Sequence, residues 1–176
     1  MTFLLTFALA TALTATQSAP YQLNDSVKQL LTAGDNVTAL STARDAVASA
    51  EALLGSNHPA TAMIIRNLAL AYLANGDTAH AEAAARRSLA ILETRFSTTD
   101  ASLVPVLNVL TETYVAEGRL ERARLTAKRA VEIGPEAGLH YATALRNIGA
   151  VLEIQSRGNG SAKQYDRAAT SSHPVQ

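Results

Sequence analysis

Several residue types that would indicate particular chemistry are absent or scarce in this chain of 176 residues. It has no cysteine, which excludes disulfide bonds, thiolate metal sites and cysteine nucleophiles. It has no tryptophan, few other aromatic residues and no long alternation of β-branched residues that would predict strands. Acidic and basic side chains number 15 each, without a block of one sign, so a face that neutralises nucleic-acid phosphates is not indicated.

Catalytic and cofactor signatures are also missing. The four histidines are far apart and lack the spacing of metal ligands: His58, His80, His140 and His173. Gly158 to Gly160 lacks the lysine of a phosphate-binding loop, and no serine stands in a nucleophile elbow. Glu112, Glu117 and Glu121 fit exposed pairs with nearby arginines better than an acid/base set. We therefore predict a protein that is not an enzyme, with no catalytic residue, metal or cofactor.

The N-terminus carries an apolar run, FLLTFALATALTA, from Phe3 to Ala15. This length is typical of a signal peptide and too short for a comfortable membrane span, so no membrane insertion of the mature chain is expected. Small residues follow, which suggests processing near Ser18 or Ala19 and a secreted or periplasmic protein. The alternatives are an apolar first helix of the fold or a wrongly placed start codon, with a cytoplasmic location.

What the chain has in abundance is alanine, about a fifth of all residues, together with other good helix formers. It also has an internal repeat. Gly34, Gly76 and Gly118 are 42 residues apart, and each is followed five residues later by an alanine. Such a period is typical of stacked helical units. A glycine suits the left-handed residue just past a helix end, and Asp35 and Asp77 follow as expected caps of the next helix.

Each repeat also has the apolar period of a helix. In the first helix of the central repeats, the pattern falls on Ile65, Leu68, Ala69 and Tyr72, then on Leu107, Leu110, Thr111 and Tyr114. The second helices carry smaller residues at the same spacing: Ala81, Ala85 and Ser88, then Ala123, Ala127 and Ala130. A stripe of large residues facing a stripe of alanines allows two helices to pack closely. In the last copy the best register places Ser156 at the glycine position, with Tyr165 and Ala168 in a second helix.

These residues resemble the tetratricopeptide repeat, whose pattern has a leucine, a small residue and a tyrosine before the alanines. The 42-residue spacing and the segments RNLALAYLANGD and RNIGAVLE are similar to the kinesin-light-chain variety. The resemblance implies an all-α, right-handed solenoid of about three and a half helical hairpins. Its predicted bounds are residues 20–169, with repeats at 21–54, 58–96, 100–134 and 138–169, after a signal peptide over 1–19 and before a polar tail over 170–176.

The resemblance also implies that the first helix of each pair lines a concave groove. The residues that this register places there are Arg66, Asn67, Leu70, Asn108, Val109, Glu112, Arg146 and Asn147. Asparagine amides can bind the main chain of an extended peptide, as an asparagine ladder does in that family. Arg66 and Arg146 could select a carboxylate. The alternative is that these residues form the solvated face of amphipathic helices.

Two functions remain open at this point. The first is a module that binds another protein or a peptide, or a helix of it, in the groove. The second is an assembly component that associates with itself, or with a longer repeat array, through apolar ends of the solenoid. The sequence names no partner, because one fold of this kind serves many unrelated partners.

Overall fold

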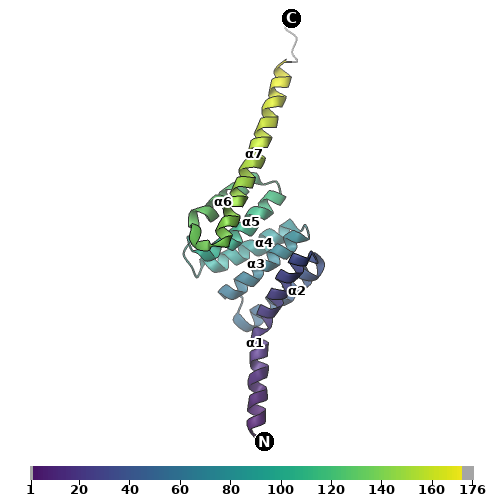
Figure 1. Cartoon of the computed structure of the whole chain (residues 1–176), viewed down its shortest axis with the longest axis vertical. Helices are drawn as coiled ribbons and strands as arrows, with labels where there is room; N and C mark the ends of the chain where they lie inside the picture. The colour runs from purple at the N-terminus through teal and green to yellow at the C-terminus, as the bar shows by residue number, and fades with distance from the viewer. Residues whose placement is uncertain (1, 172–176) are drawn as a thin grey trace.

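The computed structural model describes the backbone of residues 2–171 and the side chains of residues 18–158. In these residues all regular structure is helical, and consecutive helices pack as antiparallel hairpins (Figure 1). The three hairpins are α1 (Thr2–Ala33) with α2 (Asn36–Leu54), α3 (Pro59–Ala74) with α4 (Thr78–Glu93), and α5 (Val104–Ala116) with α6 (Leu120–Ile133). A seventh helix, α7 (Leu139–Ser171), packs on α5 and α6, and short 3-10 turns precede α5 (Ala101–Leu103) and α7 (Pro135–Ala137). The predicted all-α solenoid of about three and a half hairpins is confirmed.

The repeated glycines make the tight turn inside each hairpin. Gly34, Gly76 and Gly118 have φ angles of 79°, 76° and 71°, in the left-handed region that costs glycine little. Asp35 and Asp77 then cap α2 and α4, because their carboxylates accept the backbone N–H three residues later. The 42-residue spacing therefore reflects one turn chemistry repeated along the chain.

Alanines make the close contact within each hairpin. The second helices bury Ala81 and Ala85 in α4, and Ala123 and Ala127 in α6, completely. The first helices fill the rest of the core with large side chains such as Leu107 of α5. A methyl group at the helix crossing leaves room for the neighbouring backbone, so the predicted pairing of large and small stripes is confirmed.

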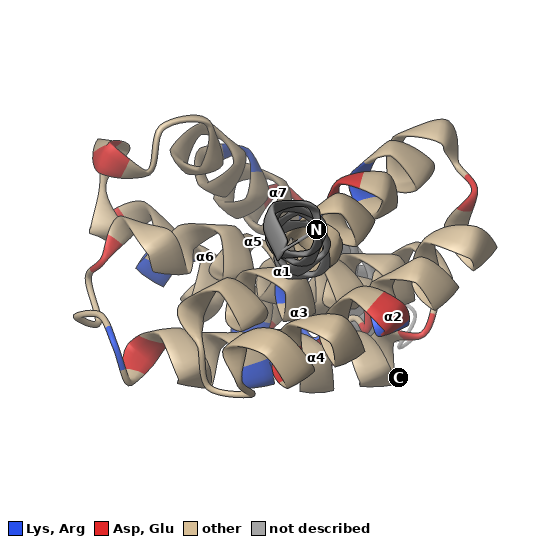
Figure 2. Ribbon diagram, turned by 90° about the horizontal axis from the view of Figure 1, so that it is seen from below, with Lys and Arg blue, Asp and Glu red and all other residues tan. Residues whose placement is uncertain are grey.

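The hairpins stack so that their first helices are closer together than their second helices. Contacts run from α1 to α3, from α3 to α5 and from α5 to α7, whereas α2, α4 and α6 make no comparable contact with one another in the described residues. The array is therefore curved, with the first helices on its inner face and the second helices on its outer face. Acidic and basic residues are scattered over the ribbon without a block of one sign in the view of Figure 2.

The last repeat differs from the expectation. The predicted turn at Ser156 is wrong, because α7 continues as one helix to Ser171. Ser156 lacks the conformational freedom that glycine gives to the three observed turns. Its hydroxyl donates to the carbonyl oxygen of Glu153, a local bond made within the helix. As a result, no second helix packs back on α7 within the described residues, and Leu145 and Leu152 are 44% and 50% exposed.

The predicted signal peptide and the predicted polar tail lie at the two ends of the chain. Residues 1–17 of the predicted signal peptide lie outside the residues with described side chains, and its cleavage stays a prediction. The predicted polar tail lies mostly outside the described backbone, at residues 172–176. In the described residues, no helix is both long enough and apolar enough to cross a membrane.

Candidate functional site

A small cavity lies on the inner face, where three successive first helices meet. Its volume is about 170 Å³, and its walls come from α3, α5 and α7. The residues that line it are Arg66, Leu70, Pro105, Asn108, Val109, Glu112, His140 and Thr143. Five of the eight predicted groove residues are among them, although they are spread over two repeats. The stacking of hairpins therefore brings residues that are distant in sequence into one site.

Asn108 lines this cavity from α5. Its side chain is 4% exposed, and its Nδ2 donates to the carbonyl oxygen of His140 at 2.8 Å. Since that carbonyl can only accept, the orientation of the amide is fixed. The other amide atom, Oδ1, is buried and has no hydrogen-bond donor. A buried acceptor without a partner costs about 1–3 kcal/mol, which a donor supplied by a ligand could recover.

Asn67 and Arg66 are held by each other on α3. Arg66 donates to Oδ1 of Asn67 through Nε and Nη2, at 3.2 and 2.8 Å, and Asn67 Nδ2 donates to Oδ1 of Asn24 at 2.7 Å. Burial lowers the pKa of the Arg66 guanidinium from its ordinary value. Asn67 is 2% exposed, so its amide positions Arg66 rather than facing solvent. Asn24 of α1 completes this chain and was not found from the sequence, because it belongs to the weakest copy of the repeat.

Arg146 and Asn147, the predicted groove residues of α7, join the same site through Glu112. Asn147 Nδ2 donates to Glu112 Oε1 at 3.3 Å, and Arg146 Nη2 lies 3.7 Å from the same oxygen. The Arg146 side chain is 71% exposed, so its charge is accessible from solvent. Glu112 therefore links α5 to α7, while Arg146 is the groove arginine best placed to meet a ligand carboxylate.

His140 is a site residue that the sequence interpretation missed. The sequence pattern bears on His140 only as a metal ligand, whereas its place on the cavity wall arises when α7 packs on α5. Burial, together with the positive charge of Arg66, lowers the pKa of the His140 imidazole below its ordinary value. The side chain is therefore uncharged at neutral pH, which leaves Arg66 and Arg146 as the positively charged side chains among the predicted groove residues.

Part of the chain matches a known family of helical-repeat proteins. Residues 27–94, which span α2, α3 and α4, match the tetratricopeptide-repeat family. This part of the chain is made of tetratricopeptide repeats. A search of curated protein sequences finds no match to it.

Solved structures with the same fold include kinesin-light-chain-like repeats. BtubC (BKLC) from P. vanneervenii aligns with a TM-score of 0.69 and 18% identity over 89% of this chain. Kinesin-light-chain-type repeats from Podosopora anserina align with a TM-score of 0.62 and 21% identity over 80% of this chain and 77% of that chain. A TPR-like protein from Chlorobium tepidum aligns with a TM-score of 0.60 and 16% identity over 78% of this chain and 96% of that chain. This chain spans 66% of BtubC, and at these identities the likeness shows the fold alone.

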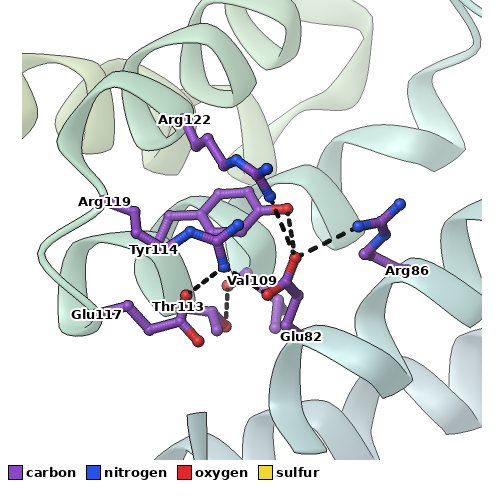
Figure 3. Close-up of polar contacts among 8 residues, drawn as sticks. All are labelled: Glu82, Arg86, Val109, Thr113, Tyr114, Glu117, Arg119 and Arg122. Carbon is purple, nitrogen blue, oxygen red and sulfur yellow. Dashed lines mark hydrogen bonds and ion pairs between the residues drawn. The ribbon is translucent and has the colours of Figure 1, made fainter. Parts of the chain in front are cut away.

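A second polar cluster of the tetratricopeptide array lies on its outer side, around Glu82 of α4 (Figure 3). The Glu82 carboxylate accepts from the Tyr114 hydroxyl at 3.1 Å and from Arg119 Nη1 at 2.6 Å. Arg119 also donates to Glu117 at 2.7 Å, which agrees with the predicted pairing of these charges. Tyr114 is a core residue, as its position in the repeat predicted. The cluster thus ties α4 to α5 and to the start of α6.

The electrostatics of this cluster follow from burial and from its hydrogen bonds. Burial acts to raise the pKa of the Glu82 carboxyl, but the hydrogen bonds from Arg119 and Tyr114 outweigh burial and the pKa lies below its ordinary value. Burial and the bond to Glu82 raise the pKa of the Tyr114 hydroxyl. In the described residues, no three or more His, Asp or Glu side chains gather as a metal site. The polar groups of both faces therefore suit recognition by charge and hydrogen bonds.

Proposed function

We propose that the inner face binds an extended peptide segment of a partner protein. Tetratricopeptide-repeat domains are generally protein–protein interaction modules and typically non-catalytic, which sets the class of function. The observation that carries the proposal is the cavity shared by α3, α5 and α7, which is lined by Asn108, a residue whose buried Oδ1 has no partner. An extended peptide has a main-chain N–H to offer at each non-proline residue, so it supplies the kind of donor that this oxygen lacks.

The lining of the cavity suggests which peptide features are recognised. Leu70, Pro105 and Val109 give it apolar walls, and its volume of about 170 Å³ suits one side chain rather than a cofactor. Arg146 lies exposed beside it and can form a bidentate pair with a carboxylate. We therefore expect the preferred peptide to carry one apolar side chain for the cavity and an acidic residue close to it.

Charge reversal at Arg146 tests this function. A labelled peptide is first selected from an array of random extended sequences, and its affinity is measured by fluorescence anisotropy. Arg146→Glu should weaken binding by tenfold or more, because a hydrogen bond to a charged group contributes about 1.5–3 kcal/mol. Arg66→Gln should also weaken binding, because Arg66 lines the cavity itself.

Arg95→Glu is the matched control. Arg95 is exposed just beyond the end of α4 and lines no part of the inner cavity, so the same change of charge should leave affinity unaltered. If Arg95→Glu lowered the affinity as much as Arg146→Glu, the loss in Arg146→Glu would reflect the overall charge of the protein and not a contact at the inner face. Peptides that bind equally well to the parent, Arg146→Glu and Arg66→Gln would place recognition on another surface.

A second candidate function, self-association, is favoured by the exposed face of α7. Leu145 and Leu152 are seven residues apart, so they lie on one side of the helix, with the exposed Gly149 between them. In the other repeats a second helix covers the corresponding side. We propose that the same face of a second copy covers it, since a self-complementary patch forms a closed two-fold dimer.

Oligomeric state tests this candidate. Leu145→Glu and Leu152→Glu should convert a dimer into a monomer, because each would bury an unpaired charge in the interface. Mass is measured by light scattering during size-exclusion chromatography. Leu53→Glu is the control, since Leu53 of α2 is similarly exposed at 42% but lies outside α7. A parent protein that is monomeric over the whole concentration range would remove this candidate and leave the peptide-binding function untouched.

A further inference from the structure

The outer face of the array carries a larger groove than the inner face. It lies between the second helices α4 and α6 and has a volume of about 500 Å³. Leu107 and Leu110 of α5 form its floor, and Leu89 and Leu125 line its sides. This groove exists because the curvature of the stack separates the second helices, while Leu107 and Leu110 beneath it stay buried. Leu125 is 54% exposed, so this part of the apolar lining is accessible from outside.

The rim of this groove is positively charged. Arg86 of α4 and Arg122 and Arg129 of α6 line it, and none of the described residues that line it is acidic. Arg129 is already held by Glu93 at 2.6 Å. Arg86 and Arg122 therefore set the charge that the groove presents to a partner.

Arg86 and Arg122 are incompletely neutralised within the chain. Both approach a single carboxylate, that of Glu82, at 3.4 and 3.7 Å (Figure 3). That carboxylate is already engaged at shorter distances by Arg119 and by the Tyr114 hydroxyl. Both rim arginines are also more than half exposed. Glu117 pairs with Arg119 alone, so Arg86 and Arg122 have only the distant Glu82 carboxylate between them among the ion pairs of the described residues. This leaves room for a second carboxylate from outside.

We propose that this outer groove binds an acidic amphipathic segment of a partner protein, distinct from the peptide on the inner face. A leucine-sized side chain of the segment packs on the exposed Leu125 and the partly exposed Leu89, above the buried Leu107 and Leu110. Its carboxylates pair with Arg86 and Arg122, which reach the groove from opposite helices. The occupant is acidic because the rim is cationic, and it is a polypeptide because the lining combines accessible apolar side chains with separated charges.

The probe for this site is a short fluorescein-labelled peptide in which glutamates flank leucines at helical spacing. Its counterpart has lysine at every glutamate position. Fluorescence anisotropy should show binding of the acidic peptide and at least tenfold weaker binding of the lysine peptide. The double variant Arg86→Gln/Arg122→Gln should weaken the acidic peptide about tenfold or more. The control Arg124→Gln, on α6 but outside the groove lining, should bind as the parent does.

A change at Glu82 gives an effect of the opposite sign. Glu82→Gln removes the internal competitor for Arg86 and Arg122, so the acidic peptide should bind severalfold more tightly. Glu121→Gln removes an equal charge from a carboxylate that pairs with Arg124 instead, and it should leave affinity unchanged. A purely structural role of Glu82 would weaken binding or leave it unaltered.

Three outcomes would overturn the proposal. They are no binding of the acidic peptide to the parent, equal binding of the lysine peptide, and equal losses in the double variant and in Arg124→Gln. The inner-face variant Arg146→Glu should not affect the acidic peptide beyond the small effect of net charge. Failure of the outer groove is thereby separated from failure of the peptide-binding function of the inner face.

Discussion

Ala123→Leu should lower the free energy of unfolding by about 1–3 kcal/mol, and Ala81→Leu should do the same. Both alanines are completely buried where the second helix of a hairpin packs against its neighbours. A leucine adds three carbon atoms at a position where the helices have no space for them, so either the helices separate or the side chain leaves its preferred rotamer. Urea unfolding followed by circular dichroism measures the loss.

Ala83→Leu is the control for these two variants. Ala83 lies on α4, two residues from Ala81, but on its exposed side. Leucine and alanine are both good helix formers, so this substitution should change stability by no more than about 0.5 kcal/mol. Unfolding curves of Ala81→Leu and Ala123→Leu that coincide with that of Ala83→Leu would refute the arrangement of helix faces described above.

Glu82→Gln should destabilise the protein by about 1–2 kcal/mol at neutral pH. The carboxylate accepts charge-assisted bonds that join α4 to α6, through Arg119, and a bond from Tyr114 of α5. Such bonds contribute more than neutral ones, although solvent screens part of the effect at this position. Glutamine has the same shape but no charge, so the loss reports the charge rather than the packing. Thermal unfolding of parent and variant side by side measures it.

The difference between the two proteins should also depend on pH. The folded-state pKa of Glu82 lies below its ordinary value of 4.5, so the folded chain holds this proton less readily than the unfolded chain. The stabilisation is therefore complete above pH 4.5 and is lost as the pH falls through the folded-state pKa. The melting temperatures of parent and Glu82→Gln should converge in that acidic range. A difference that stays constant down to full acid unfolding would show that Glu82 acts through packing alone.

For the groove asparagines, the repeat pattern predicted the helix on which each lies but not its hydrogen-bond partner. Asn67 and Asn147 occupy equivalent positions in their repeats, whereas Asn108 stands one residue earlier, at the position of Arg66 and Arg146. The sequence placed all three asparagines on the first helices. Their partners differ, however: Asn24, the His140 carbonyl and Glu112 respectively. Each partner comes from the neighbouring repeat, so it depends on how the hairpins stack and not on the period of one helix. This is why three residues of one type play three different roles.

At the C-terminal end of the array, the repeat pattern predicted a turn that the structure does not have. The repeat register predicted a turn at Ser156 because the surrounding residues match a hairpin. Local conformation decided otherwise, since the three observed turns all have glycine with a positive φ angle and this position does not. The result is one long helix with an exposed apolar side.

By itself, the sequence determined the class of the protein: the alanine and leucine stripes require paired helices, and the regular glycines set the length of each pair. Those features are local, and a helix period or a left-handed turn can be inferred from a few neighbouring residues. Tertiary structure alone decided which residues share a site. The inner cavity joins α3, α5 and α7, and the outer groove opens between α4 and α6, because the curvature of the stack brings first helices together and separates second helices. That curvature is the sum of many contacts between repeats, and no short stretch of sequence contains it.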